Sequence, residues 1–167
     1  KLSAVPVVKG CRGEESSCFS TFDERMVPGK KITWKMEPWR FPAGASPEDA
    51  LNDVLAIIKD YPLGQAGIDQ GGFRVLEAGG GFVWAEFASV SGRIDEFEVG
   101  VQADGVAQVR SGSRGVTDVF GNYAMQPDGG SNAKRLNYFA AQLRKRGWVT
   151  ADITEATHSF YFKANQE

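Results

Sequence analysis

The sequence predicts an α+β domain in which an antiparallel sheet of about four strands carries two helices on one face, with an extended arm at the N-terminus. Three observations lead to this prediction: a strand pair with a tight turn in residues 94–118, a second strand pair around a triple glycine, and two amphipathic helical segments. The predicted organisation is an arm in residues 1–45, the domain in residues 46–150 and a tail in residues 151–167.

The strand pair in residues 94–118 shows the alternation of apolar with polar or small residues that is typical of strands with one exposed face. A three-residue turn ending at Gly105, with this glycine in the left-handed conformation, places Val99 opposite Val109 and Glu98 opposite Arg110. A two-residue turn would place Val99 opposite Arg110 and mix the two faces. The sequence therefore favours the three-residue turn.

The second strand pair is expected at residues 73–77 and 82–87, on either side of Gly79–Gly81. A phosphate-binding glycine loop would require a helix, and usually a lysine, directly after the glycines. The segment that follows is FVWAEF, which has a β pattern. A hairpin loop is therefore favoured over a nucleotide site.

The first helix is expected to begin at Ser46–Pro47, a hydroxyl cap followed by proline at the first helical position. Tyr61–Pro62 is expected to end it, because the residue before a proline is pushed out of helical geometry. The stripe that faces the core comprises Leu51, Val54, Leu55 and Ile58.

The second helix is expected to start with Asn132 as its N-cap and to end before Gly147. Its apolar stripe comprises Leu136, Phe139, Ala140 and Leu143. Its last turn carries three basic residues, Arg144, Lys145 and Arg146, which complement the helix dipole at a solvated end or, alternatively, face an acidic partner. The segment SFYFKA in the tail is expected to form an edge strand or an arm.

Composition excludes some classes of function. The net charge of −2 argues against nucleic-acid binding, and no apolar run approaches the roughly 18 residues that a membrane span requires. The chain starts with Lys1, so we expect either a processed mature form or the first ordered residue of a longer chain.

The two cysteines, Cys11 and Cys18, enclose a short polar loop. In an oxidising compartment they are expected to form a disulfide, and in a reducing compartment they would be free thiols. Zinc is less favoured, because only His158 could supplement them and a structural zinc site has four ligands. The disulfide is the favoured interpretation.

The residues with catalytic potential do not form a recognised pattern. His158 is the only histidine, and Ser113 lacks the strand-to-helix G-x-S-x-G context of a nucleophile elbow. Glu96 and Glu98 share one strand face with Arg110, which is the ordinary arrangement of a polar face. We predict no catalytic residue, no metal ion and no cofactor.

The segment RSGSRGVTD, which begins at Arg110, is interpreted as a polar loop. Arg114 has five fixed donors, and Asp118 or backbone carbonyls are the expected acceptors, while the hydroxyl of Ser113 can hold an irregular turn. Such a loop either braces the domain or lines a polar ligand pocket. Bracing is favoured.

Candidate contacts with another protein are the aromatic residues of the arm, side chains of the irregular insert in residues 119–131, and the basic end of the second helix. Aromatic anchors are enriched at interfaces, although the alternative is that those of the arm pack on the chain's own sheet. The candidates are Trp34, Trp39, Phe41, Tyr123, Met125, Arg144, Lys145 and Arg146.

Five short motifs together resemble the domain-of-unknown-function 1499 family over about residues 11–147. They are the segments CFST at 18–21, IDEFEV at 94–99 and RSGSR at 110–114, then Asp118, and NAKRL at 132–136. The residues of the polar loop and of the helix start that carry most of the resemblance are Arg110, Ser113, Arg114, Asp118, Asn132 and Arg135. About a dozen residues lie between Asp118 and Asn132, where that family usually has none, and the arm is also long.

The resemblance implies no established catalytic residue, and it implies a plastid location, as for plant and algal members that are thylakoid-associated. We therefore expect a non-enzymatic peripheral subunit of a larger membrane-bound assembly, a photosystem-type thylakoid complex, with only peripheral membrane contact. One alternative is a small-molecule or lipid-binding module that uses the concave sheet face and the RSGSRG segment. Another is a serine hydrolase that uses Ser111 or Ser113.

Overall fold

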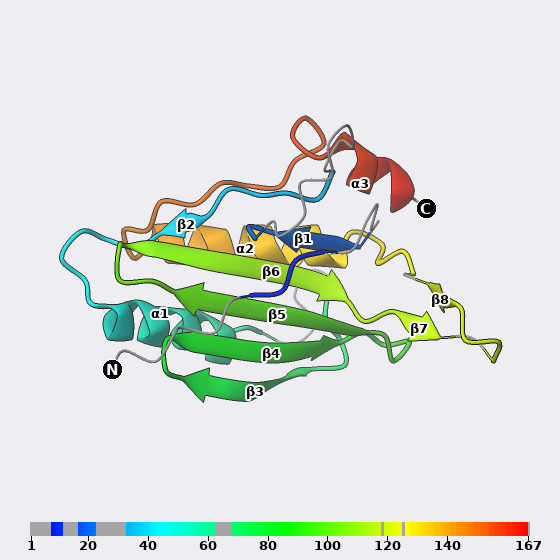
Figure 1. Ribbon diagram of the computed structural model, residues 1–167, viewed down its shortest axis with the longest axis horizontal. Helices are drawn as coiled ribbons and strands as arrows, with labels where there is room; N and C mark the ends of the chain where they lie inside the picture. Colours follow the sequence, from blue (N-terminus) through cyan, green and yellow to red (C-terminus); the bar gives the residue numbers. More distant parts are fainter. Residues whose placement is uncertain are drawn as a thin grey trace.

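The computed structural model describes residues 8–11, 17–22, 33–62, 68–117, 119–124 and 126–166, with only the backbone at 116–117 and 123–124. Its main sheet is antiparallel with the order β1-β6-β5-β4-β3, and β2 also pairs with β6 (Figure 1). The elements are β1 Cys18–Ser20, β2 Trp39–Arg40, α1 Pro47–Lys59, β3 Phe73–Gly79, β4 Phe82–Ala88, β5 Ile94–Val101, β6 Val106–Ser113, β7 Val116–Thr117, β8 Tyr123–Ala124, α2 Ser131–Arg144 and α3 Ser159–Ala164.

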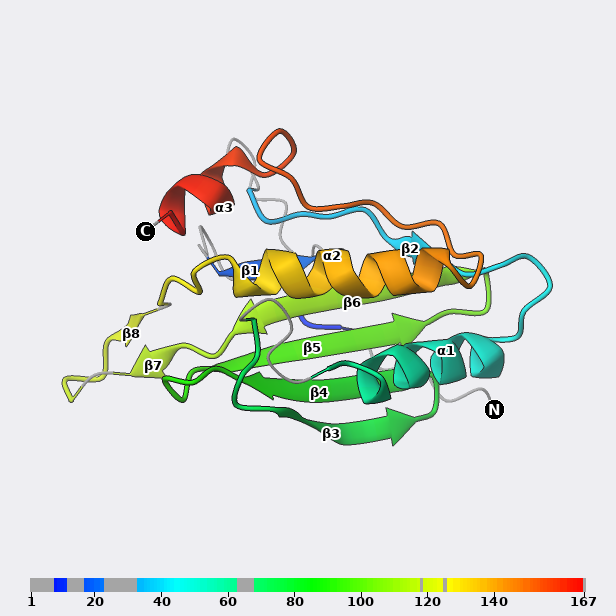
Figure 2. The same ribbon diagram turned by 180° about the vertical axis from the view of Figure 1, so that it is seen from behind.

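Helices α1 and α2 lie on one face of this sheet, and their apolar side chains form one core with those of the strands (Figure 2). The predicted α+β class is confirmed. The four strands β3 to β6 form the body of the sheet, and β1 and β2, which come from the predicted arm, extend it beyond β6.

The central hairpin has the predicted register. Val99 pairs with Val109 and Glu98 with Arg110, and Gly105 in the turn has φ +87°. The hairpin of β3 and β4 is also present, with Gly79 paired to Phe82. Both turns contain glycines, and a glycine adopts the positive φ that these turns require without steric cost.

The segment from Arg110 to Ser113 is part of β6, so its prediction as a loop is wrong. Ser111 pairs with Phe97 of β5 on one side and with Phe19 of β1 on the other. Hydroxyl groups are tolerated in this central strand because each finds a buried hydrogen-bond partner, described below.

Helix α1 begins as predicted, with Ser46 as its N-cap. Asp49 accepts from the backbone N–H of Ser46 while the Ser46 hydroxyl accepts from the Asp49 N–H, a reciprocal capping box. The buried residues are Ala50, Leu51, Val54, Ile57 and Ile58, whereas Leu55 is only partly buried. The predicted stripe is therefore correct except at Leu55.

Helix α2 begins two residues earlier than predicted. Its N-cap is Gly130, with φ +82°, and the predicted cap Asn132 lies inside the helix with its side chain buried. The amide of Asn132 binds side chains of the core instead of the helix end. The predicted stripe is confirmed, because Leu136, Phe139, Ala140 and Leu143 are all buried.

The aromatic residues of the arm pack on the chain's own core, which is the alternative to contact with another protein. Trp39 is fully buried in β2 and contacts Phe97, and Phe41 contacts Trp148. Trp34 is also buried. Burying these large rings stabilises the fold, because each ring removes a large apolar area from water.

The N-terminal segment is fastened to the sheet by a Cys11–Cys18 disulfide. The backbone N–H of Lys9 donates to Glu98, and the Ser20 hydroxyl donates to the Lys9 carbonyl. Residues 8–11 therefore cross the face of the sheet opposite the helices (Figure 1).

The tail segment SFYFKA forms helix α3, so its prediction as an edge strand or arm is wrong. Tyr161 is its buried residue, and its ring lies 4.5 Å from that of Phe19 in β1. In this helix the side chain of Tyr161 is buried in the core, whereas that of Phe160 is exposed. The helix directs its side chains by a period of 3.6 residues, and a strand would direct them by a period of two.

Gly71 offers a test of close packing at the start of β3. A Cβ atom there would lie 2.8 Å from the Ala88 carbonyl oxygen and 2.9 Å from that of Ser89. Because these are backbone atoms of the paired strand, we expect Gly71→Ala to lower the free energy of unfolding by about 1–3 kcal/mol. Urea denaturation measures this change.

Gly10→Ala is the matched control, because the nearest atom to a Cβ at Gly10 is a carbonyl oxygen 3.5 Å away. We expect a change within about 0.5 kcal/mol for this variant. Equal losses in the two variants would contradict the steric explanation.

Candidate functional site

A buried arginine organises the polar residues at the N-terminal end of α2. Arg135 is completely buried, and its Nη2 atom lies 2.6 Å from Asp69 and 2.7 Å from Asp95. Its Nε atom also donates to Asp69, and its guanidinium lies over the ring of Phe87. One cation from α2 thus joins the segment that follows α1 to the start of β5.

Serine side chains complete the hydrogen bonds of Asp95. The hydroxyls of Ser113 in β6 and Ser131 in α2 donate to its two oxygens at 2.6 and 2.8 Å. Arg93 makes a further ion pair with Asp95, at 3.2 Å. Because every contact donates, the pattern suits an ionised carboxylate.

Asn132 connects this ion pair to β6. Its Oδ1 atom accepts from the Ser111 hydroxyl at 2.6 Å and from Arg135 at 3.1 Å. Its Nδ2 atom donates to Ser113 at 3.1 Å and to Asp128 at 2.6 Å. The amide oxygen thus accepts from a hydroxyl and a guanidinium while the amide nitrogen donates to a hydroxyl and a carboxylate, which explains why this residue is turned inward and does not cap the helix.

Asp128 is a third buried carboxylate of the network, beside Asp69 and Asp95. Its two oxygens accept from the Tyr161 hydroxyl at 2.8 and 2.9 Å, and Oδ1 also accepts from the Gly130 N–H. The Tyr161 oxygen in turn accepts from the backbone N–H of Ala133. Asp128 therefore ties α3 to the first turn of α2.

The carboxylates of Asp95 and Asp128 have pKa values shifted in opposite directions. Burial would raise the pKa of Asp95, but Arg135, Ser113 and Arg93 outweigh burial and hold it below its ordinary value. Burial raises the pKa of Asp128, which is contacted by no arginine of the described residues, and hydrogen bonds from Asn132 and Tyr161 only partly offset this effect. The charge of Asp95 nearby raises the pKa of Asp128 further.

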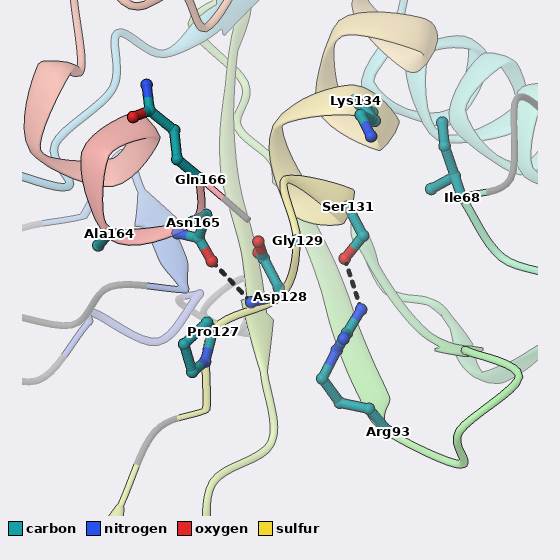
Figure 3. Close-up of a pocket in the computed structure, with 10 residues that line it drawn as sticks. All are labelled: Ile68, Arg93, Pro127, Asp128, Gly129, Ser131, Lys134, Ala164, Asn165 and Gln166. Carbon is teal, nitrogen blue, oxygen red and sulfur yellow. Dashed lines mark hydrogen bonds between the residues drawn. The ribbon is translucent and has the colours of Figure 1, made fainter.

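A cavity of about 670 Å³ opens beside this network, between α2, α3 and the residue before β5 (Figure 3). Its lining residues are Ile68, Arg93, Pro127, Asp128, Gly129, Ser131, Lys134, Ala164, Asn165 and Gln166. In Figure 3, Arg93 donates to the Ser131 hydroxyl, and the Asp128 N–H donates to the Asn165 side chain.

A second ionic cluster lies on the opposite face of the sheet. Arg110 pairs with Glu96 and Glu98, at 3.3 Å each, and Arg114 donates to Glu86 and Glu96. Hydrogen bonds from Arg74 and Arg114 outweigh burial and lower the pKa of Glu86. Arg114 thus finds glutamates on the neighbouring strands, while its predicted acceptor Asp118 lies outside the described residues.

The predicted polar segment is therefore divided between two faces. Ser111 and Ser113 face the helices and join the buried network, whereas Arg110 and Arg114 face away from the helices. The helix-side face of the sheet is covered by α1 and α2 (Figure 2).

In the described part of the chain, His158 and the serines of β6 have separate hydrogen-bond partners. His158 hydrogen-bonds to the Lys35 carbonyl and to Thr157, while Ser111 and Ser113 donate to an amide and a carboxylate. Within the ranges that the structure describes, no group of three or more His, Cys, Asp or Glu side chains is arranged to hold a metal ion.

The basic end of α2 finds partners within the chain. Arg144 pairs with Asp152, and Arg146 pairs with Asp53 of α1. Lys145 donates to Gln142. Two of the three predicted contacts for an acidic partner are thus occupied by acids of the same molecule.

The remaining interaction candidates from the insert are not placed. Met125 lies outside the described residues, and at Tyr123 the structure describes only the backbone, which pairs in β8.

Sequence reasoning missed several residues of the buried network. They are Asp69, Asp128 and Tyr161, together with Arg93 and Ser131. The available signal was the helix-facing position of Arg135, one residue before Leu136, since a buried arginine requires acidic partners. That signal does not show which acids approach, because Asp69 and Asp128 both follow irregular segments.

A protein-family model described as "Protein of unknown function (DUF1499)" matches residues 11–143 of the chain. No curated protein and no solved structure matches it.

The buried ion pair predicts a large effect of Arg135→Met. The variant leaves Asp69 and Asp95 without their shared cation, so we expect it to lower the free energy of unfolding by about 3–5 kcal/mol. Arg144→Met, which removes an exposed pair with Asp152, should cost less than about 1 kcal/mol. Urea denaturation of both variants tests this, and comparable losses would refute the central role of Arg135.

The lowered pKa of Asp95 predicts a pH-dependent effect of Asp95→Asn. Its folded pKa lies below its unfolded value, so its contribution to stability is present above the unfolded pKa and is lost as pH falls through the folded pKa. We expect wild type and variant to differ by about 3 kcal/mol at neutral pH and to converge below pH about 4. Denaturation across this pH range tests it, and a constant difference would contradict it.

Proposed function

Since the chain belongs to the DUF1499 family, a family of unknown function, we propose a function for it from its own geometry: a non-enzymatic peripheral subunit that docks on a larger membrane-bound assembly. The observation that carries this proposal is an apolar tip on the segment between β7 and β8. Val119 and Phe120 are 93% and 86% exposed.

The tip projects beyond the body of the domain. β7 and β8 form a two-stranded sheet separate from the main sheet and extend away from the end of β6 (Figures 1 and 2). Two adjacent exposed side chains, one of them aromatic, at the end of a projecting segment fit an apolar pocket on a partner protein. They take the place of the arm aromatics as anchors.

The interior of the domain supports a structural role. The hydroxyls of Ser111 and Ser113 are hydrogen-bonded to acceptors that hold them in place, and the only histidine lies elsewhere. In the part of the chain that the structure describes, no helix is long and apolar enough to cross a membrane.

We further propose that the assembly is a photosystem-type complex of the plastid thylakoid. Support comes from the motif set that resembles a family with plant and algal members. The Cys11–Cys18 disulfide favours an oxidising compartment.

A double variant, Val119→Ser with Phe120→Ser, tests the docking tip. Both side chains are exposed, so we expect the fold to be retained while co-migration with thylakoid complexes on native electrophoresis falls. Removing two apolar anchors should weaken docking by about 2 kcal/mol or more, about thirtyfold.

Val90→Ser is the matched control, because Val90 is also exposed but lies in the turn between β4 and β5. This variant should co-migrate like the wild type. A wild-type chain that stays unassociated in thylakoid extracts would overturn the proposal. Equal losses of co-migration in the two variants would show that the tip is not the docking element.

A further inference from the structure

We infer that the cavity beside α2 binds a small organic anion through Arg93 and Lys134. Both side chains line the cavity, and they come from different parts of the fold, the residue before β5 and the second turn of α2 (Figure 3). This inference concerns a ligand site and is independent of docking at the hairpin tip.

Arg93 presents donors to the cavity in a fixed orientation. Its Nε atom donates to Asp95 and its Nη2 atom to Ser131, which together hold the guanidinium in place. Among the described residues, its Nη1 atom makes no hydrogen bond. Since a guanidinium has donors on all three nitrogens, Arg93 retains donors for an oxyanion.

Lys134 supplies a second cation. Within the described ranges its ammonium group forms no ion pair and no hydrogen bond, and only its backbone N–H is bonded, to the Gly130 carbonyl. A Cβ atom at Gly130 would lie 3.7 Å from Cε and 4.0 Å from Nζ of Lys134, so its side chain extends back along the first turn of α2. The ammonium group therefore lies near the part of the cavity formed by Gly129 and Ser131.

The one acid in the lining does not neutralise these cations directly. Asp128 is only 3% exposed, and its oxygens accept from Tyr161, Asn132 and Gly130. Two backbone N–H groups at the start of α2 are also occupied. That of Asn132 donates to Asp128, and that of Ala133 donates to the hydroxyl oxygen of Tyr161. Recognition of the anion therefore depends on the two cationic side chains and not on the helix end.

The chemistry of the lining defines the class of ligand. Arginine and lysine together bind phosphate or carboxylate oxygens. A cavity of about 670 Å³ has room for more than a single phosphate, and Ile68, Pro127 and Ala164 offer apolar contacts. The expected ligand is a small organic anion with one such group.

Inorganic phosphate is the probe for the oxyanion subsite. The ¹⁵N-labelled chain is titrated with sodium phosphate at neutral pH, with sodium chloride at equal ionic strength as the reference. We expect saturable shifts of the backbone amide signals of Ser131, Lys134 and Asn165. The same shifts with chloride, or none with phosphate, would overturn the inference.

Lys134→Gln and Lys145→Gln separate the site from general charge attraction. Lys134→Gln removes one lysine charge from α2 and Lys145→Gln removes one from its C-cap, and both side chains are exposed. We expect Lys134→Gln to weaken phosphate binding at least about tenfold, the loss of one charge-assisted contact, and Lys145→Gln to leave it unchanged. Equal weakening in the two variants would show a diffuse charge effect and refute the site.

Discussion

The ion pairs of Arg135 with Asp69 and Asp95 are the constraint on which the rest of the structure depends. Burying these charges has a desolvation cost that only close contacts and full hydrogen bonding offset. Each group here meets that condition: Arg135 contacts both acids, and serine hydroxyls complete Asp95. The position of α2 over the sheet follows, because any sliding of the helix would leave at least one charge buried without a partner.

Charge balance explains why Asp95 and Asp128, two of the buried carboxylates next to α2, behave differently. Arg93 and Arg135 neutralise Asp69 and Asp95, whereas the partners of Asp128 among the described residues are neutral donors. Its raised pKa gives a contribution to stability that is present below its unfolded pKa and lost as pH rises through the folded pKa. Asp95 has the opposite dependence, so the two acids partly cancel in the stability of the whole chain.

The sequence predicts what local chemistry determines and misses what tertiary contacts determine. Strand alternation and Gly105 set the central hairpin, and Ser46–Pro47 sets the start of α1, because both depend on neighbours in the chain. The polarity of Ser111 and Asn132 suggests a loop and a cap only if both face water. Their burial depends on Arg135 and Asp128, which come from other segments, so no local pattern reveals it.

The segment from 119 to 131 links the interior to the proposed docking tip. It contains the exposed Val119 and Phe120 at one end and the buried Asp128 at the other. Asp128 fastens the base of this segment to Asn132 of α2 and to Tyr161 of α3, so the base is anchored at several points. An exposed anchor binds more tightly when its support loses little conformational freedom on binding. The buried network thus favours the proposed docking, because it anchors the base of the segment from which the tip projects.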